Sequence, residues 1–140
     1  MIKVLCLLST LLIFPTMINS SVKINLEDYI NSFSWGKRIV LFIAKEKDTH
    51  LINKTDNFFK RSSCENEVRN LKYIRIVGDE INKYIFSDRY KNKYGIWLIG
   101  YDGRDKSYSN DTSLLKEIHN IIDTMPMRKS EMSEQNEKCN

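Results

Sequence analysis

An unbroken apolar run, Ile39–Ala44, constrains the fold of this chain more than any other sequence feature. The run is rich in β-branched residues and shows no alternation between apolar and polar positions, which is typical of a strand with both faces buried. Such strands occupy the centre of sheets that helices cover. Because 140 residues suffice for one domain, the sequence predicts a single α/β domain built around this strand.

The segments after this run alternate between helical and strand-like patterns. The expected elements are a helix from Leu51 to Cys64 or Val68, a strand over 73–77, a helix over 81–90, a strand over 96–99 after Gly95, a turn at Asp102-Gly103, a strand over 106–109, and a helix from Thr112 or Ser113 to Met125. This order, βαβ-α-ββ-α, predicts a four-stranded mixed sheet flanked by helices in a thioredoxin-like arrangement. We expect the domain to span 35–127, between a lead-in over 21–34 and an exposed tail over 128–140.

The first twenty residues have the features of a secretory signal peptide. Lys3 is their only charge, an apolar run extends from Val4 to Ile18, and the small residues Ser20 and Ser21 follow. The run is shorter than the roughly 20 residues of a spanning helix, and Pro15 interrupts it. The sequence therefore predicts a secreted or periplasmic protein without a stable membrane span after cleavage; the alternative is an uncleaved anchor.

The charge pattern argues against nucleic-acid binding. The formal net charge is +4, and the loss of Lys3 with the signal segment reduces it to +3. Basic residues are scattered and have acidic neighbours, whereas nucleic-acid binding usually needs a concentrated basic stripe. Only the segment 89–94 interleaves basic and aromatic residues, and because it is one short cluster, a solvated helix end is the favoured explanation.

Thiol redox chemistry would need a low-pKa cysteine at the start of the first helix after the central strand. Residues Lys45 to His50 stand there, and none is a cysteine. The mature chain keeps Cys64 and Cys139, which can pair in an oxidising compartment; a free or intermolecular Cys139 is the alternative.

No other catalytic or metal-ligating pattern stands out. His50 and His119 lack ligand spacing, and neither a nucleophile elbow nor a P-loop is present. Asp102 and Asp105 flank the tight turn, where aspartate normally serves turn geometry rather than acid–base catalysis. We therefore expect no catalytic residue, no metal and no cofactor. Asn53 and Asn110 lie in glycosylation sequons, which matter only in a eukaryotic source.

Three stretches in the second half of the chain resemble a known family. They are Tyr94–Ile96, Leu98–Gly103, and Ile121–Arg128 followed by Glu131-Met132, and the Met-Pro-Met-Arg motif is the most specific part. Trp35 and the strand Arg38–Phe42 are similar to the opening strand of the same family. The family is domain of unknown function 4174, found in small secreted bacterial proteins, in animal coiled-coil domain-containing protein 80 and in sushi-repeat-containing proteins. The resemblance covers roughly residues 26–132.

This resemblance implies a thioredoxin-like fold without redox cysteines, an extracellular location and, in the animal proteins, association with the matrix. It implies no established enzymatic activity, so it assigns no catalytic residue. The chain departs from the family in lacking a short proline-containing insertion between Ile96 and Trp97 and a glutamine in the first helix. A ligand site formed by those loops is therefore in doubt here.

The motif residues Gly95, Asp102, Gly103, Asp123 and Met125–Arg128 have a structural interpretation. We expect Met125 to complete the apolar face of the last helix, Pro126 to fix the exit of the chain, Met127 to fold back onto the sheet edge, and Arg128 to bind the last helical carbonyls. In the alternative interpretation, the segment binds a partner.

Three functions remain open from the sequence. The favoured one is a non-enzymatic module that binds an extracellular or periplasmic protein or a matrix component. The second is a degenerate peroxiredoxin-like enzyme acting through Cys64. The third, a small-molecule or lipid carrier, needs a sizeable internal pocket, for which a core of this size leaves little room.

Overall fold

The computed structural model describes residues 21–135 and residue 139. Its main sheet contains β2 (Arg38–Ala44), β3 (Leu71–Val77), β5 (Gly95–Ile99) and β6 (Asp105–Ser109), in the order β3-β2-β5-β6. β2 pairs parallel with β3, whereas the β2–β5 and β5–β6 pairs are antiparallel. The predicted α/β class, the four-stranded mixed sheet and its central strand are thereby confirmed.

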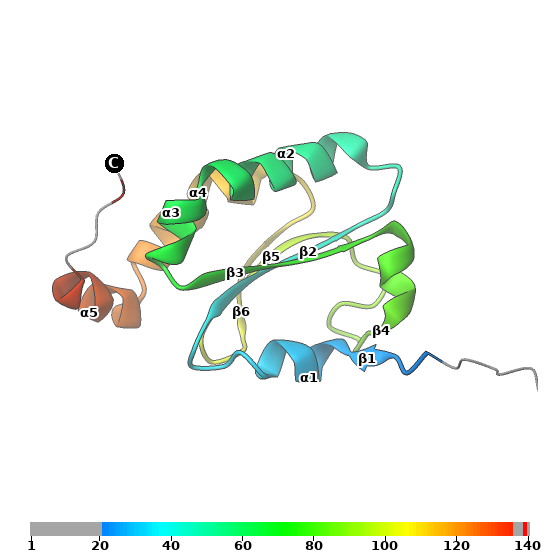
Figure 1. The fold of residues 1–140 in the computed structure, drawn as a ribbon, viewed down its shortest axis with the longest axis horizontal. Helices are drawn as coiled ribbons and strands as arrows, with labels where there is room; N and C mark the ends of the chain where they lie inside the picture. Colours follow the sequence, from blue (N-terminus) through cyan, green and yellow to red (C-terminus); the bar gives the residue numbers. More distant parts are fainter. Residues whose placement is uncertain (1–20, 136–138, 140) are drawn as a thin grey trace, which may run out of the picture.

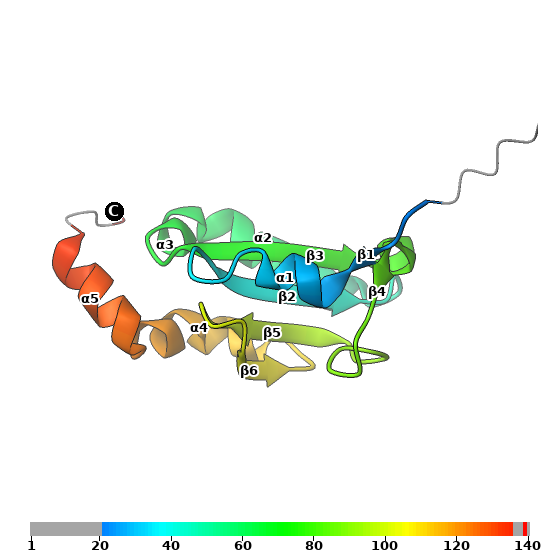
Figure 2. The same cartoon turned by 90° about the horizontal axis from the view of Figure 1, so that it is seen from below.

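Helices cover both faces of this sheet (Figures 1 and 2). On one face, Val40 and Phe42 pack against α2 (Thr49–Arg61) and α4 (Ser113–Asp123). On the other face, Ile39 and Leu41 pack against α1 (Leu26–Asn31). All seven residues of β2 are buried, as its uninterrupted apolar composition predicts. The helix expected to run from Leu51 to Cys64 or Val68 is divided at Ser62 into α2 and α3 (Ser63–Glu67).

Residues 21–34 contain more structure than a lead-in. They hold β1 (Ile24–Asn25) and α1, and the side chains of Leu26 and Ile30 are fully buried in the core. Asn25 caps α1, because its side-chain oxygen accepts a hydrogen bond from the Asp28 amide at 3.2 Å. The folded unit therefore begins at β1 rather than at residue 35.

The prediction of a helix over 81–90 is wrong. The segment forms a 3₁₀ helix, η1 (Gly78–Lys83), and a short strand, β4 (Tyr84–Ile85), which pairs parallel with β1. Ile81 and Tyr84 pack onto the core, but Ile85 is exposed, so these residues do not form one helical stripe. Pairing with β1, which is distant in sequence, outweighs the local helical pattern.

The C-terminal segment is not simply an exposed tail. Pro126 occupies the first turn of α5 (Pro126–Glu134), where its missing amide costs no hydrogen bond. Arg128 is buried, and Cys139 is joined to Cys64 of α3 by a disulfide. The prediction of a signal peptide over residues 1–20 lies outside the described residues. Within residues 21–135, no helix is long and apolar enough to cross a membrane.

Candidate functional site

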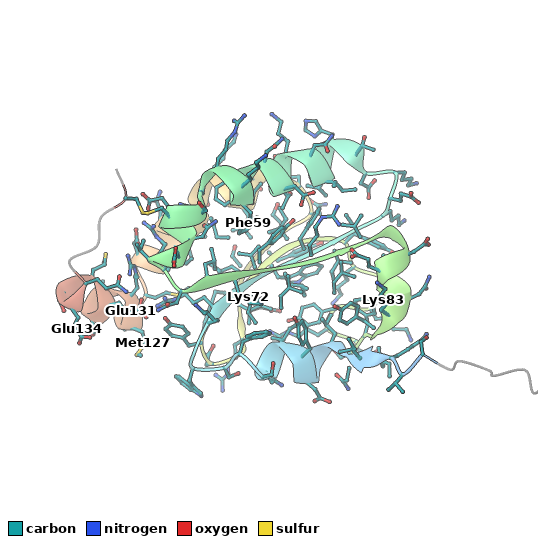
Figure 3. All side chains as sticks on the ribbon, viewed as in Figure 1. Phe59, Lys72, Lys83, Met127, Glu131 and Glu134 are labelled. Atoms are coloured by element: carbon teal, nitrogen blue, oxygen red, sulfur yellow. A yellow bond between two sulfur atoms is a disulfide. The ribbon has the colours of Figure 1, made fainter. Side chains whose placement is uncertain are left out.

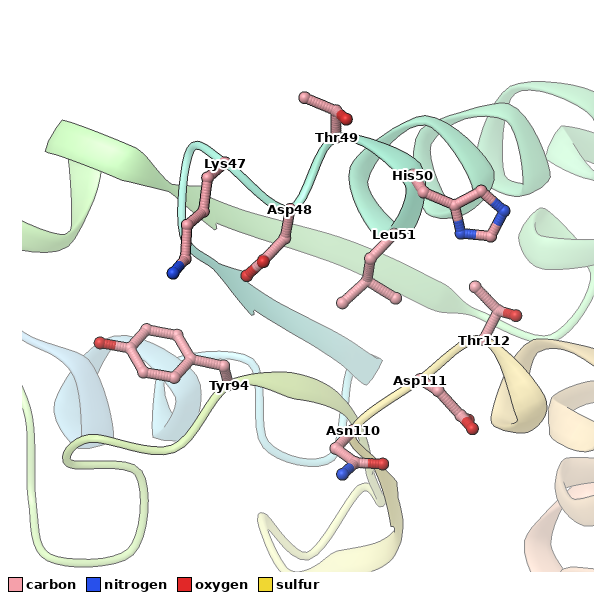
Figure 4. A pocket seen from close by; sticks show the side chains of 9 residues that line it. All are labelled: Lys47, Asp48, Thr49, His50, Leu51, Tyr94, Asn110, Asp111 and Thr112. Carbon is pink, nitrogen blue, oxygen red and sulfur yellow. The ribbon is translucent and has the colours of Figure 1, made fainter.

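A cleft of about 500 Å³ lies at the start of α2, beyond the end of β2. Lys47 to Leu51 line one side, and Tyr94 and the segment Asn110–Thr112 after β6 line the other (Figure 4). Thiol redox chemistry in a thioredoxin-like protein would need a cysteine at this position, the start of the first helix after the central strand.

No cysteine lines this cleft. Asp111 accepts hydrogen bonds from the Ser113 and Ser109 hydroxyls and from the Ser113 amide, which lower its pKa to about 2. It is therefore a carboxylate at neutral pH. The Asp48 carboxylate accepts a hydrogen bond from the Lys45 amide at 3.3 Å. Over the described part of the chain, no group of three or more His, Cys, Asp or Glu side chains is arranged to hold a metal ion.

A second cavity, of about 480 Å³, lies at the opposite end of β2. We call it the Trp35 groove. Trp35, Tyr101, Met125 and Met127 form its walls, Arg38 forms its floor, and its remaining lining residues are Asp102, Lys106, Ile121, Thr124 and Pro126. Unlike the first cleft, it combines large apolar side chains with a buried cation.

Two apolar side chains of this groove are open to solvent. Trp35 is 72% exposed and Met127 is 53% exposed. Trp35 has a φ of 64°, which is rare for a bulky residue, and its amide donates to the Tyr101 carbonyl at 2.8 Å. Met127 lies in the first turn of α5 (Figure 3).

Arg38 is fully buried at the floor of the groove. Its Nη1 donates to the Arg69 carbonyl at 2.9 Å, to the Tyr101 hydroxyl at 3.0 Å and to Glu131 Oε2 at 3.0 Å. Its guanidinium carbon lies 4.0 Å from the centroid of the Tyr101 ring. Nε and Nη2 are also buried, and neither has a hydrogen-bond partner among the described residues.

A cluster of ion pairs continues from the groove towards α3 and α4. Arg69 donates to Asp123 through Nε at 3.0 Å and Nη2 at 2.7 Å, and Arg128 Nε donates to the same carboxylate at 3.2 Å. Burial on its own raises the pKa of Asp123, but hydrogen bonds and charges from the two arginines outweigh it and lower that pKa. The pKa of Glu131 is lowered in the same way, with hydrogen bonds from Tyr101 and Arg38 opposing burial.

The C-terminal motif residues meet at this end of the molecule, although two of them differ from expectation. Met125 packs against the core below α4 as expected, and Pro126 begins α5. Met127 is exposed instead of folding back on the sheet edge, because α5 turns its side chain outward. Arg128 binds the Val68 carbonyl at 2.6 Å, which belongs to the end of α3 and not to α4.

The remaining candidate residues lie away from the groove or serve local geometry. Asp102 binds the Arg104 amide and Lys106 within the turn, and Gly103 has a φ of 73°. Asp105 pairs with Arg89. His119 shares a 2.8 Å hydrogen bond with Asn66. The exposed sequon residues Asn53 and Asn110 are on α2 and after β6, and Gly95 begins β5.

The sequence reasoning did not identify Arg38, Arg69, Tyr101 or Glu131 as members of one site. One signal was available, because Arg38 directly precedes an apolar run that is buried on both faces, where a charged residue needs partners. The identity of those partners could not be read from the sequence, since Glu131 is 93 positions away.

No curated protein matches this chain. No solved structure matches it either. The model of the family described as Domain of unknown function (DUF4174) matches residues 29–131, which include all four strands of the main sheet, the Trp35 groove and the Met-Pro-Met-Arg segment. Since the match covers well over half of the chain, the protein belongs to this family of domains of unknown function.

Proposed function

We propose that the protein is a secreted, non-enzymatic, thioredoxin-like module that binds a protein or matrix partner through the Trp35 groove. The observation that carries this proposal is the exposure of Trp35 and Met127, which both line one cavity. Large aromatic and methionine side chains are enriched where proteins bind one another. The sheet order β3-β2-β5-β6, with a helical crossover between parallel β2 and β3, supports the thioredoxin-like arrangement.

Extracytoplasmic location is supported by two features. One is the short apolar segment near the N-terminus, and the other is the disulfide between Cys64 and Cys139, since such bonds persist in oxidising compartments. N-terminal sequencing of the exported protein tests the location, with a mature end near Ser21 as the expected result. A membrane-bound protein that retains Met1 would contradict it.

The alternative thiol-enzyme function has less support. Cys64 is engaged in a disulfide and stands on α3, away from the start of α2. A disulfide-bonded sulfur provides no thiolate nucleophile. Rapid alkylation of Cys64 in the native protein, together with peroxide consumption that a Cys64→Ser variant loses, would favour the enzyme.

Binding through the groove is tested by chemical cross-linking of the full-length exported protein to the extracellular proteins of its source. We expect Trp35→Ala and Met127→Ala to lose the cross-linked partner. Ile85→Ala is the matched control, because Ile85 is equally exposed, at 53%, but lies on β4 at the far end of the molecule. Equal loss in all three variants, or in none, would contradict the proposed surface.

A further inference from the structure

We infer that the Trp35 groove recognises the C-terminal carboxylate of a peptide, with Arg38 as the residue that binds it. This inference rests on the proposed function and names the chemistry of the partner. It starts from an imbalance in the hydrogen bonding of Arg38. Nη1 has partners on the Arg69 backbone, on Tyr101 and on Glu131, whereas Nε and Nη2 have none within residues 21–135 and 139.

Buried polar groups are almost always hydrogen-bonded, and Nε and Nη2 of Arg38 are exceptions although its charge is paired with Glu131. Nε and Nη2 form one edge of the planar guanidinium, with two parallel N–H donors. This edge matches the two oxygens of a carboxylate in a bidentate pair. The Tyr101 ring, 4.0 Å from the guanidinium carbon, fixes the plane of the group and so the direction of both donors.

The lining of the groove favours an apolar side chain next to the carboxylate. Trp35, Met125 and Met127 offer aromatic and thioether surface beside Arg38. The last residue of a peptide carries a carboxylate and a side chain on the same carbon atom, so one residue can occupy both parts of the groove. Because Arg38 is fully buried, the wall side chains must shift to admit the ligand, and unbranched methionines adapt readily.

An internal Asp or Glu fits less well. The peptide continues on both sides of an internal residue, so the groove would need two exits for the chain. A C-terminal residue has peptide on one side only and needs one exit. A backbone carbonyl could accept one N–H but cannot occupy both donors as a carboxylate does. These two alternatives define the control peptides.

The test is a ¹H–¹⁵N NMR titration of the full mature protein with three short peptides. They are acetyl-Ala-Leu-Phe with a free carboxylate, the same peptide as its C-terminal amide, and acetyl-Ala-Glu-Phe amide. The signals followed are the Trp35 indole N–H and the Arg38 Nε–H. Trp97, the only other tryptophan, is buried in the core and serves as an internal reference.

We expect the free carboxylate to shift both signals saturably, with the two amides binding at least tenfold more weakly and Trp97 unchanged. Trp35→Ala should weaken binding, and Ile85→Ala should not. Equal affinity for the three peptides, or shifts that leave Trp35 and Arg38 unchanged, would overturn the inference. The comparison of peptides does not depend on an Arg38 variant, which is at risk of misfolding.

Failure of this inference differs from failure of the proposed function. If Trp35 and Met127 are needed for a cross-linked partner but the peptides show no preference for a carboxylate, the inference is wrong and the binding function stands. If the carboxylate peptide binds but no extracellular partner depends on Trp35, the inference stands and the proposed function is wrong.

Discussion

Three arginine side chains donate to backbone carbonyls at the end of α3 and just after it. Arg38 donates to the Arg69 carbonyl, Arg69 to the Glu65 carbonyl and Arg128 to the Val68 carbonyl, at 2.6–2.9 Å. The final carbonyls of a helix have no partner within the helix, and cations near them are favourable. Each arginine thus satisfies backbone acceptors in addition to its carboxylate partner.

At the scale of a single residue, Asp111 should titrate with a pKa of about 2. Its hydrogen bonds from Ser113 and Ser109 stabilise the charged form, so Ser113→Ala should raise the pKa towards about 4, the ordinary value for aspartate. Carboxyl-carbon NMR titration measures both values. Ser133→Ala on α5 is a control that should leave Asp111 unchanged, and a wild-type pKa near the ordinary value would contradict the geometry of the cleft.

At the scale of one element, α1 shows why short helices escape sequence analysis. It contains six residues, and only Leu26 and Ile30 are buried. Two apolar positions four residues apart do not establish a helical period. The four strands of the main sheet were predictable because each shows a compact apolar or alternating run near turn residues, and β2 has no polar position except Arg38 at its start.

We expect Leu26→Ala to lower the free energy of unfolding by about 2–5 kcal/mol, because it removes a fully buried side chain and leaves a cavity in the core. Urea unfolding followed by tryptophan fluorescence measures this change. Val22→Ala, four residues earlier at a position 92% exposed, should have an effect within about 0.5 kcal/mol. If the two variants are equally stable, α1 does not belong to the folded unit.

At the scale of the whole molecule, ion pairs join elements that are far apart in sequence. Asp123 at the end of α4 binds Arg69, just before β3, and Arg128 on α5. Glu131 on α5 binds Arg38 at the start of β2. These pairs connect α5 to β2 and to α4. The Cys64–Cys139 disulfide adds a covalent link from α3 to a position beyond α5.

This arrangement predicts a loss of stability in acid. The folded-state pKa values of Asp123 and Glu131 are lowered, so the unfolded chain binds more protons as the pH falls. Their stabilising contribution is complete above about pH 4–5, the range of the unfolded pKa values, and is lost as the pH falls through the folded ones. Unfolding measured from pH 7 to pH 2 should show this decline.

Asp123→Asn should cost about 1–3 kcal/mol at pH 7, because it leaves two largely buried arginines without their shared carboxylate. It should also flatten the decline in acid. Glu117→Gln, at an exposed position on the same helix, is the control and should change neither quantity. An Asp123→Asn variant with the wild-type acid profile would show that the ion pairs do not govern stability.

The sequence by itself determined the α/β class, the four main strands and the absence of a cysteine at the start of α2. These features depend on residue identity and on short-range periodicity, which the chain displays directly. Two of the three strand pairings also followed from succession, since a helical crossover joins the parallel neighbours β2 and β3 and a tight turn joins the antiparallel β5 and β6. The pairing of β2 with β5 did not follow from succession.

The Trp35 groove could be identified only from the tertiary structure. Arg38, Tyr101 and Glu131 come together from three distant segments, and their polar groups can be buried because each finds hydrogen-bond partners that the others supply. The same holds for β1 and β4, two-residue strands that exist through their mutual pairing. Local patterns cannot encode such elements, because their stability comes from contacts between segments that are remote in the sequence.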